Sequence, residues 1–193
     1  MGNLVLNGAT SGATTITPTD AVTTTLTFPT TTGTLALSSS IGVIQVKQGQ
    51  TSTQQSFSNN TWTDLTGLTV NITPTSSSNK ILVLATVWIN SDTGSANLYG
   101  RLNRNGTIVG TASNDTAGYA GNGGWRALSD GQDASYNIHN IGFTWLDSPA
   151  STSTLTYKIQ GLTNAGNFFF NKSGSGSAYF YMYSTITVME VTP

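Results

Sequence analysis

The stretch AYFYMYSTITVMEV, residues 178–191, decides how the rest of this chain can fold. Its side chains alternate with a period of two, which is the signature of a β-strand. One face is apolar and the other is rich in tyrosine: Phe180, Met182, Ile186 and Val188 against Tyr179, Tyr181 and Tyr183. A strand with two such faces is a poor solvent-exposed edge, because an apolar edge promotes aggregation. We therefore expect this last strand near the middle of a sheet, with its apolar face in the core.

The tyrosine face of this strand should also be buried against another surface. A buried tyrosine removes roughly 150–250 Å² from water, and this contributes up to about 4 kcal/mol before losses from side-chain entropy and hydroxyl desolvation. A monomer would leave that surface exposed, whereas a symmetric assembly would bury it. We expect other copies of the same chain to cover this face.

The composition limits the partners. The chain has 193 residues, 37% of them hydrophobic, which is enough for one domain with a sizeable core. Only 8% are charged, and the formal net charge is -1. Nucleic acid and a membrane surface are therefore poor partners, because both attract a basic patch.

Other classes of protein are disfavoured by what the sequence lacks. It contains no cysteine, so disulfides, thiol catalysis and thiolate metal sites are excluded. No apolar run reaches the length of a membrane helix, and residues 1–8 do not resemble a signal peptide. We expect neither a cofactor nor a metal.

Residues 1–40 have a composition of their own. Thirteen of the 25 residues from Thr10 to Thr34 are threonine. A flexible tail is one interpretation, because such segments bury little apolar surface. The other is an extended arm that orders by pairing with neighbouring chains, which the β-propensity of threonine favours. Its attachment residues would be the apolar positions of the short alternating runs: Leu4, Leu6, Ile16, Leu26, Phe28 and Leu35.

Residues 41–193 predict an antiparallel sandwich of about eight to ten strands. Runs with strand periodicity lie at 41–47, 68–73, 80–90, 96–104, 107–110, 136–145, 153–161, 167–171 and 178–191. Asn105-Gly106 is a strong hairpin signal. The run 80–90 is apolar on both faces, so we expect it inside a sheet. No window shows helical spacing over three turns.

A long loop is predicted between Thr111 and Ser135, and long loops are often functional. Its aromatic and basic residues could contact a glycan, although packing within the fold is the simpler role: Tyr119, Trp125 and Arg126. Its aspartates could form a weak hydrolase or calcium site, although capping of turns is the simpler role: Asp115, Asp130 and Asp133.

No catalytic motif is present. His139 is the only histidine, and it shares a predicted strand face with Ile141, Phe143 and Trp145. A lone histidine on such a face is usually packed or hydrogen-bonded. No nucleophile motif accompanies it, so we expect no enzyme.

Two resemblances join these observations. The run Leu6-Asn-Gly-Ala-Thr-Ser-Gly-Ala-Thr-Thr-Ile-Thr-Pro-Thr-Asp-Ala, with Leu26-Thr-Phe-Pro-Thr-Thr-Thr-Gly-Thr-Leu-Ala, resembles segments of tailed-bacteriophage fibres and other virion surface proteins. The strand rhythm from residue 41 onward is similar to the jelly rolls of the C1q and tumour-necrosis-factor type. That resemblance implies a tight trimer with aromatic residues on the threefold axis: Tyr179, Tyr181 and Tyr183, with Tyr136 or His139.

Together these observations predict a non-enzymatic virion protein made in the host cytoplasm. Residues 1–40 would form the attachment arm, and residues 41–193 a jelly-roll head that faces outward from the particle. A homotrimeric capsid decoration or cement protein, bound to the major capsid protein, is favoured over a tail fibre because the chain opens directly on the Thr-rich arm. The alternative is a tail-fibre or host-recognition module that binds carbohydrate through the 112–135 loop.

Overall fold

The structure is a computed structural model that describes residues 4–7, 13–16, 42–58, 60–93, 96–110, 125–128, 138–173 and 182–193. The chain divides into two compact units, Met1–Ala36 and Leu37–Pro193. In the first unit, β1 (Leu4–Asn7) pairs with β2 (Ala13–Ile16) as an antiparallel hairpin in which Leu4 is opposite Ile16. The predicted attachment residues Leu26, Phe28 and Leu35 lie outside the described residues.

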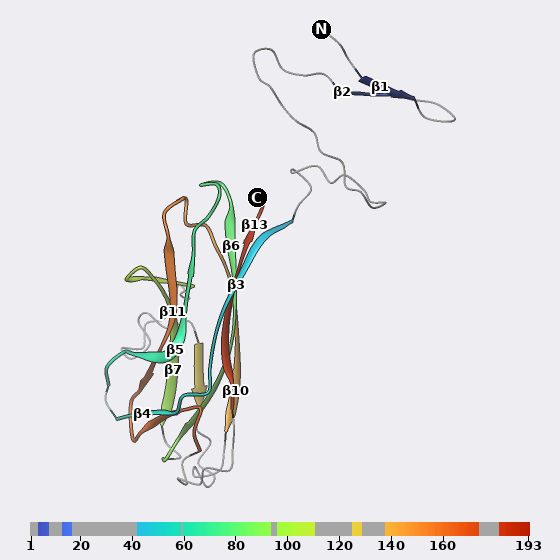
Figure 1. Cartoon of the computed structure of the whole chain (residues 1–193). Helices are drawn as coiled ribbons and strands as arrows, with labels where there is room; N and C mark the ends of the chain where they lie inside the picture. The colour runs from blue at the N-terminus through green and yellow to red at the C-terminus, as the bar shows by residue number, and fades with distance from the viewer. Residues whose placement is uncertain are drawn as a thin grey trace. The chain divides into compact units, whose positions relative to one another are not determined.

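The second unit, the head, is all-β in its described part, and every strand pairing is antiparallel (Figure 1). Its strands are β3 (Val43–Thr51), β4 (Gln55–Phe57), β5 (Thr63–Ile72), β6 (Lys80–Ser91), β7 (Asn97–Arg104), β8 (Thr107–Val109), β9 (Trp125–Leu128), β10 (His139–Asp147), β11 (Leu155–Thr163), β12 (Phe168–Phe170) and β13 (Ser184–Val191).

One sheet has four columns of strands, built around β6. Ile89 of β6 pairs with His139 of β10 and with Phe170 of β12, so these two strands lie on opposite sides of β6. β13 also lies opposite β10, which places it in the column of β12. β3 is the next column beyond β13, and β4 is the next beyond β12. The column order is therefore β3/β4, β13/β12, β6, β10.

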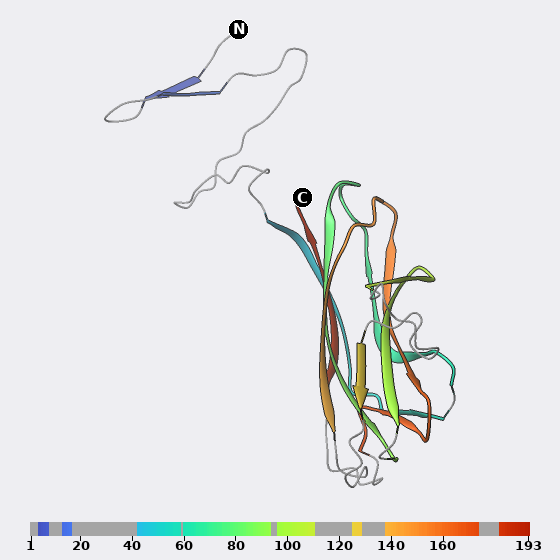
Figure 2. The same ribbon diagram turned by 180° about the vertical axis from the view of Figure 1, so that it is seen from behind.

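The second sheet has four columns in the order β5, β11, β7 and β8/β9. The two sheets face each other, as Figure 2 shows from behind. Eight columns in this order form a jelly roll, which confirms the predicted fold class. The hairpin between β7 and β8 turns at Asn105 and Gly106 with φ values of 49° and 90°, as its two-residue loop requires.

The core lies between the sheets and is built by alternate residues of each strand. The largest fully buried side chains come from both layers: Tyr157, Phe168, Phe170, Leu65, Leu68, Ile72, Ile81, Ile89, Leu98, Leu102, Ile159 and Ile186. In β11 the inward residues Leu155, Tyr157 and Ile159 are all buried, and from Ile159 onward every residue of the strand is buried. β6 is interior, as its two apolar faces predicted.

Several strands differ from the predicted runs. β13 lies between β3 and β6, as expected of the last strand, but it begins at Ser184, and residues 174–181 lie outside the described part. β5 begins at Thr63 instead of residue 68, and β4 was not predicted. Both extra segments are mostly polar, although Leu65 of β5 is fully buried and Phe57 of β4 packs against the core. One apolar residue in each segment is too little to show an apolar period.

A buried polar bridge joins the two sheets. Asp147 of β10 is 6% exposed and accepts hydrogen bonds from Arg104 of β7 at 2.5 Å and from the hydroxyl of Tyr157 on β11 at 2.7 Å. Burial and the bond to Asp147 raise the pKa of Tyr157, so the phenol stays protonated and keeps donating. The carboxylate therefore has both a charge partner and a neutral donor.

A second buried carboxylate has no cation partner among the described residues. Glu190 of β13 is fully buried and accepts hydrogen bonds from Gln45 Nε2 (2.6 Å), Asn79 Nδ2 (2.6 Å) and the backbone nitrogen and hydroxyl of Thr75 (2.7 and 2.8 Å). Burial works to raise the pKa of Glu190, but these donors outweigh it and lower the pKa to about 2. The carboxylate thus joins β3 and the β5–β6 connection to the last strand.

This network predicts how the head responds to acid. The pKa of Glu190 falls on folding, so its contribution to stability is fully present above about pH 4.5 and is lost as the pH falls toward 2. A shift from 4.5 to about 2 corresponds to roughly 3 kcal/mol. Thermal unfolding followed by circular dichroism should show a smaller loss of stability over this pH range in Glu190→Gln than in the wild type. Equal losses would contradict the assignment.

Candidate functional site

The outward surface of the β3–β13–β6–β10 sheet is the candidate site, and we call it the outer face. Strand register fixes its members, because residues paired across a sheet share a face. It consists of three rows that each cross the four strands: Val46, Met189, Leu82 and Leu146; Gln48, Thr187, Leu84 and Thr144; Gln50, Thr185, Thr86 and Gly142.

The first row is apolar in all four columns. Val46 is 52% exposed and Leu146 is 47% exposed, and Met189 and Leu82 between them are half-buried. Tyr183, which immediately precedes β13, is 61% exposed. Large apolar side chains that line up across a sheet and remain in solvent mark a surface for association.

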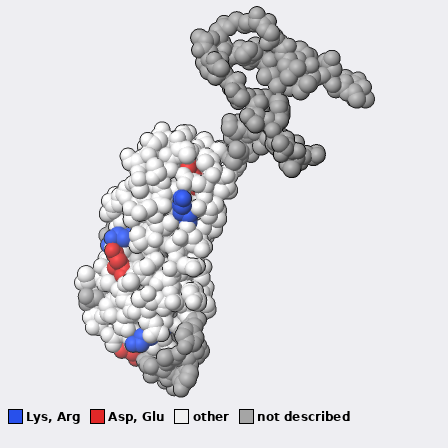
Figure 3. Space-filling model, viewed as in Figure 1, with Lys and Arg blue, Asp and Glu red and all other residues white. Residues whose placement is uncertain are grey.

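None of the twelve residues of these three rows carries a charge, and the charged residue beside them on the same side of β6 is Lys80, which pairs with Val191 beyond the first row. The face shown in Figure 3 likewise has few and scattered charged groups in the described part of the head. Some of its polar groups are already paired, since Gln48 Nε2 donates to Thr187 Oγ1 at 2.9 Å. Covering this surface would bury no charge, so the desolvation cost would be small.

Gly142 interrupts the middle of β10 without a reason inside the head. A Cβ built at this position would meet no atom within 4 Å, and the residue has no positive φ. A glycine inside a strand costs stability and often marks a point where another backbone approaches closely. Because Gly142 has no side chain, its backbone is exposed at a depression in the outer face.

Of the predicted threefold residues, Tyr183 and His139 lie in the described part of the chain. Tyr183 lies at one end of the outer face. His139 pairs with buried Ile89, so it belongs to the inward side of β10, and its Nε2 is buried without a hydrogen bond to the described part of the chain. Tyr136, Tyr179 and Tyr181 lie outside the described residues. The apolar row of the outer face could not be found from the sequence, because its members come together only through strand register.

The predicted glycan contacts lie in a segment that is not all loop. Trp125 and Arg126 belong to β9, where their backbones pair with Gly100 and Tyr99 of β7. Tyr119 lies outside the described residues, as do Asp115, Asp130 and Asp133. The long loop predicted between Thr111 and Ser135 therefore contains a fourth-column strand of the second sheet.

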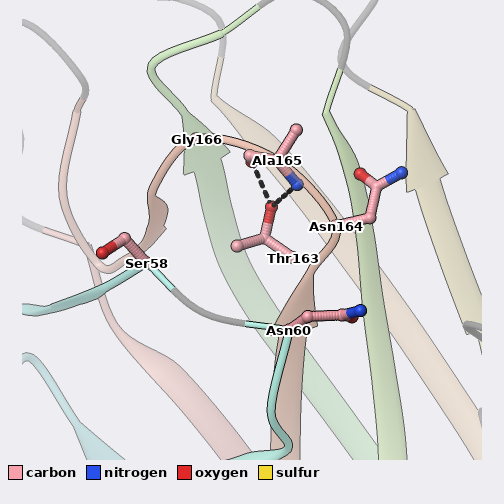
Figure 4. Close-up of a pocket in the computed structure, with 6 residues that line it drawn as sticks. All are labelled: Ser58, Asn60, Thr163, Asn164, Ala165 and Gly166. Carbon is pink, nitrogen blue, oxygen red and sulfur yellow. Dashed lines mark hydrogen bonds between the residues drawn. The ribbon is translucent and has the colours of Figure 1, made fainter.

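A small pocket of about 160 Å³ lies beside the turn that follows β11 (Figure 4). The hydroxyl of Thr163 donates to the Ala165 carbonyl oxygen at 2.6 Å and accepts from the Ala165 nitrogen. Asn164 Oδ1 accepts from the Asn97 nitrogen at 2.7 Å. These groups are used to hold the turn, so we assign the pocket a structural role.

The described part of the chain offers neither a metal cluster nor a membrane-spanning helix. No group of three or more His, Asp or Glu residues there is placed to hold a metal ion. No helix there has the length and apolar character needed to span a bilayer.

Comparisons with known proteins give low similarity. No protein-family model matches the chain, and no curated protein matches it. Among solved structures, the infectious bursal disease virus Gt strain matches at 12% identity and a TM-score of 0.43, over 97% of this chain and 46% of that one. The VP2 subviral particle of infectious bursal disease virus matches at 11% identity and a TM-score of 0.37, over 78% and 38%. The chain spans less than half the length of these proteins, and such similarity says nothing about its function.

The open space at Gly142 gives a prediction. Gly142→Val should leave the fold of the head intact, because valine suits a strand and its Cβ would meet no atom within 4 Å. The same side chain should hinder close packing of anything on the outer face. Circular dichroism should therefore be unchanged, while sedimentation velocity should show weaker association than in the wild type. Unchanged association would mean that no backbone approaches at Gly142.

Proposed function

We propose that this chain is a non-enzymatic structural protein of a bacteriophage particle. It acts as a homotrimeric capsid decoration or cement protein that binds the major capsid protein or another virion protein. Residues 1–40 form the attachment arm, and residues 41–193 form the head, which faces outward on the particle surface. This proposal requires no cofactor, nucleic acid or membrane.

The single observation that carries the proposal is the uncharged outer face with its exposed apolar row. Val46 and Leu146 sit at opposite edges of the sheet, so the apolar row extends over its whole width. A second copy of this chain suits the face, because its own surface is also poor in charge and rich in threonine. Three copies would bury their outer faces around a common axis.

The first 40 residues support attachment to a particle. Their resemblance to segments of phage virion surface proteins covers about 35 residues, and little apolar surface is available for them to fold alone. The β1–β2 hairpin keeps Leu4 opposite Ile16, in a short ribbon that could pair with another sheet.

The carboxylates in the described residues support a role without catalysis. Each of the four accepts hydrogen bonds within the head: Asp64 from Lys158 and Gln160, Asp92 from Asn167, Asp147 from Arg104 and Tyr157, and Glu190 from Gln45, Thr75 and Asn79. A general acid or base needs a group that is free to exchange a proton with a substrate. These groups are used to hold strands and turns together.

The oligomer can be tested with one charge. In sedimentation equilibrium the wild type should be a trimer. Leu146→Asp would place an unpaired carboxylate in the buried interface, so this variant should sediment as single chains. Thr66→Asp is the matched control, because it adds the same charge at an exposed position of β5 on the other sheet. A wild-type chain that sediments alone would overturn the trimer, as would a Leu146→Asp trimer of unchanged stability.

The position on the particle can be tested with antibodies against the head. Labelling of purified virions should cover the capsid with many copies. Label confined to the tail tip would instead favour the fibre or host-recognition alternative. Loss of glycan binding in Trp125→Ala would then support a carbohydrate site in the 112–135 segment.

A further inference from the structure

The outward surface of the other sheet, β5–β11–β7–β8, has a different chemistry. It holds a cavity of about 420 Å³ between the strands and the β7–β8 hairpin. The lining comes from three strands and the hairpin tip and contains no large apolar side chain: Asp64, Thr69, Asn103, Asn105, Gly106, Thr156 and Lys158. We propose that this cavity is a binding site for a neutral saccharide.

The charge of the cavity argues for a neutral ligand. Lys158 Nζ lies 2.7 Å from Asp64 Oδ2, and these are the only charged residues in the lining. Their charges cancel within the lining. Arg101 lies outside the lining, where it donates to Gln160 and lies over Trp62, so a phosphate, sulfate or sialic acid would find no unpaired cation in the lining itself. A sugar needs none, because each hydroxyl both donates and accepts hydrogen bonds.

The polar groups of the cavity are held in place from behind. Gln160 Nε2 donates to Asp64 Oδ1 at 2.6 Å, and Arg101 Nε donates to Gln160 Oε1 at 2.7 Å. The Arg101 guanidinium lies over the Trp62 ring, 4.3 Å from its centroid. This series of side-chain contacts crosses β7, β11 and β5 and fixes the Asp64 carboxylate. Little side-chain entropy is therefore lost when a ligand binds.

The hairpin forms a rigid wall. The Asn105 nitrogen donates to the Thr156 carbonyl oxygen at 3.0 Å, and the Thr156 nitrogen donates to Asn105 Oδ1 at 2.8 Å. These bonds fasten the tip of the β7–β8 hairpin to β11. The cavity is therefore present before any ligand arrives.

Several polar groups in the lining remain unused. Asn103 is only 5% exposed, and its Oδ1 accepts from the Gly106 nitrogen at 2.8 Å, but its Nδ2 bonds to no described residue. The hydroxyls of Thr69 and Thr156 also make no hydrogen bond to the described part of the chain. One amide donor and two hydroxyls thus face a ligand beside a fixed carboxylate and ammonium, a set that suits neighbouring hydroxyls of a sugar ring.

The test is binding of the full chain to an array of neutral hexose and N-acetylhexosamine oligosaccharides, with sialylated and sulfated oligosaccharides as charged comparators. The wild type should bind neutral members and show no preference for charged ones. Thr69→Val with Thr156→Val removes both hydroxyls but keeps their β-branched shape, so the fold should be retained. Titration calorimetry with the best neutral oligosaccharide should show an affinity at least about fivefold lower, the effect of losing one hydrogen bond.

Thr66→Val is the matched control, because it removes an exposed hydroxyl from β5 outside the cavity. It should bind as the wild type does, and thermal unfolding should show all variants folded. No binding of neutral oligosaccharides at millimolar concentration would overturn the proposal. Binding limited to charged oligosaccharides, or unaffected by the double substitution, would also overturn it. Because binding is measured separately from sedimentation, either proposal can fail without the other.

Discussion

The head depends on the insertion of β13 between β3 and β6. This pairing completes the sheet, and alternate residues of β13 serve two surfaces at once. Ile186 and Val188 fill the core, while Thr187 and Met189 belong to the outer face. Glu190 then ties the end of the strand to β3 and to the β5–β6 connection through donors that compensate its buried charge. Loss of this strand would open the core and remove the centre of the outer face together.

The two outward surfaces of the sandwich have opposite chemistry, although they share one scaffold. On the β3–β13–β6–β10 side, twelve uncharged residues leave apolar groups in solvent. On the other side, charged and amide groups are bonded into a fixed array around a cavity. A chain with so few charges has placed three of them, Asp64, Arg101 and Lys158, on this second surface. The proposals assign assembly to the first surface and ligand recognition to the second.

Much of the fold follows from local patterns in the sequence. β6 is a long run that is apolar on both faces, β11 alternates apolar with polar residues, and Asn105-Gly106 specifies its turn, so each of these elements could be predicted. β4 and β9 could not, because they are short and polar or lie within a Gly-rich segment. The functional surfaces were harder to predict from the sequence than the strands. The Glu190 network could not be predicted, because its partners Gln45 and Asn79 are more than 100 residues away in the sequence.

The position of β13 also constrains biosynthesis. Its hydrogen-bonding partners on β3 precede it by about 140 residues, as the 139-residue separation of Gln48 and Thr187 shows. Such distant pairing makes folding slow and leaves strand edges bare in the nascent chain. A ribosome must therefore synthesise β13 before the sandwich can close. Fragments that end before β13 would lack one of the two central columns of the outer face and the core residues Ile186 and Val188.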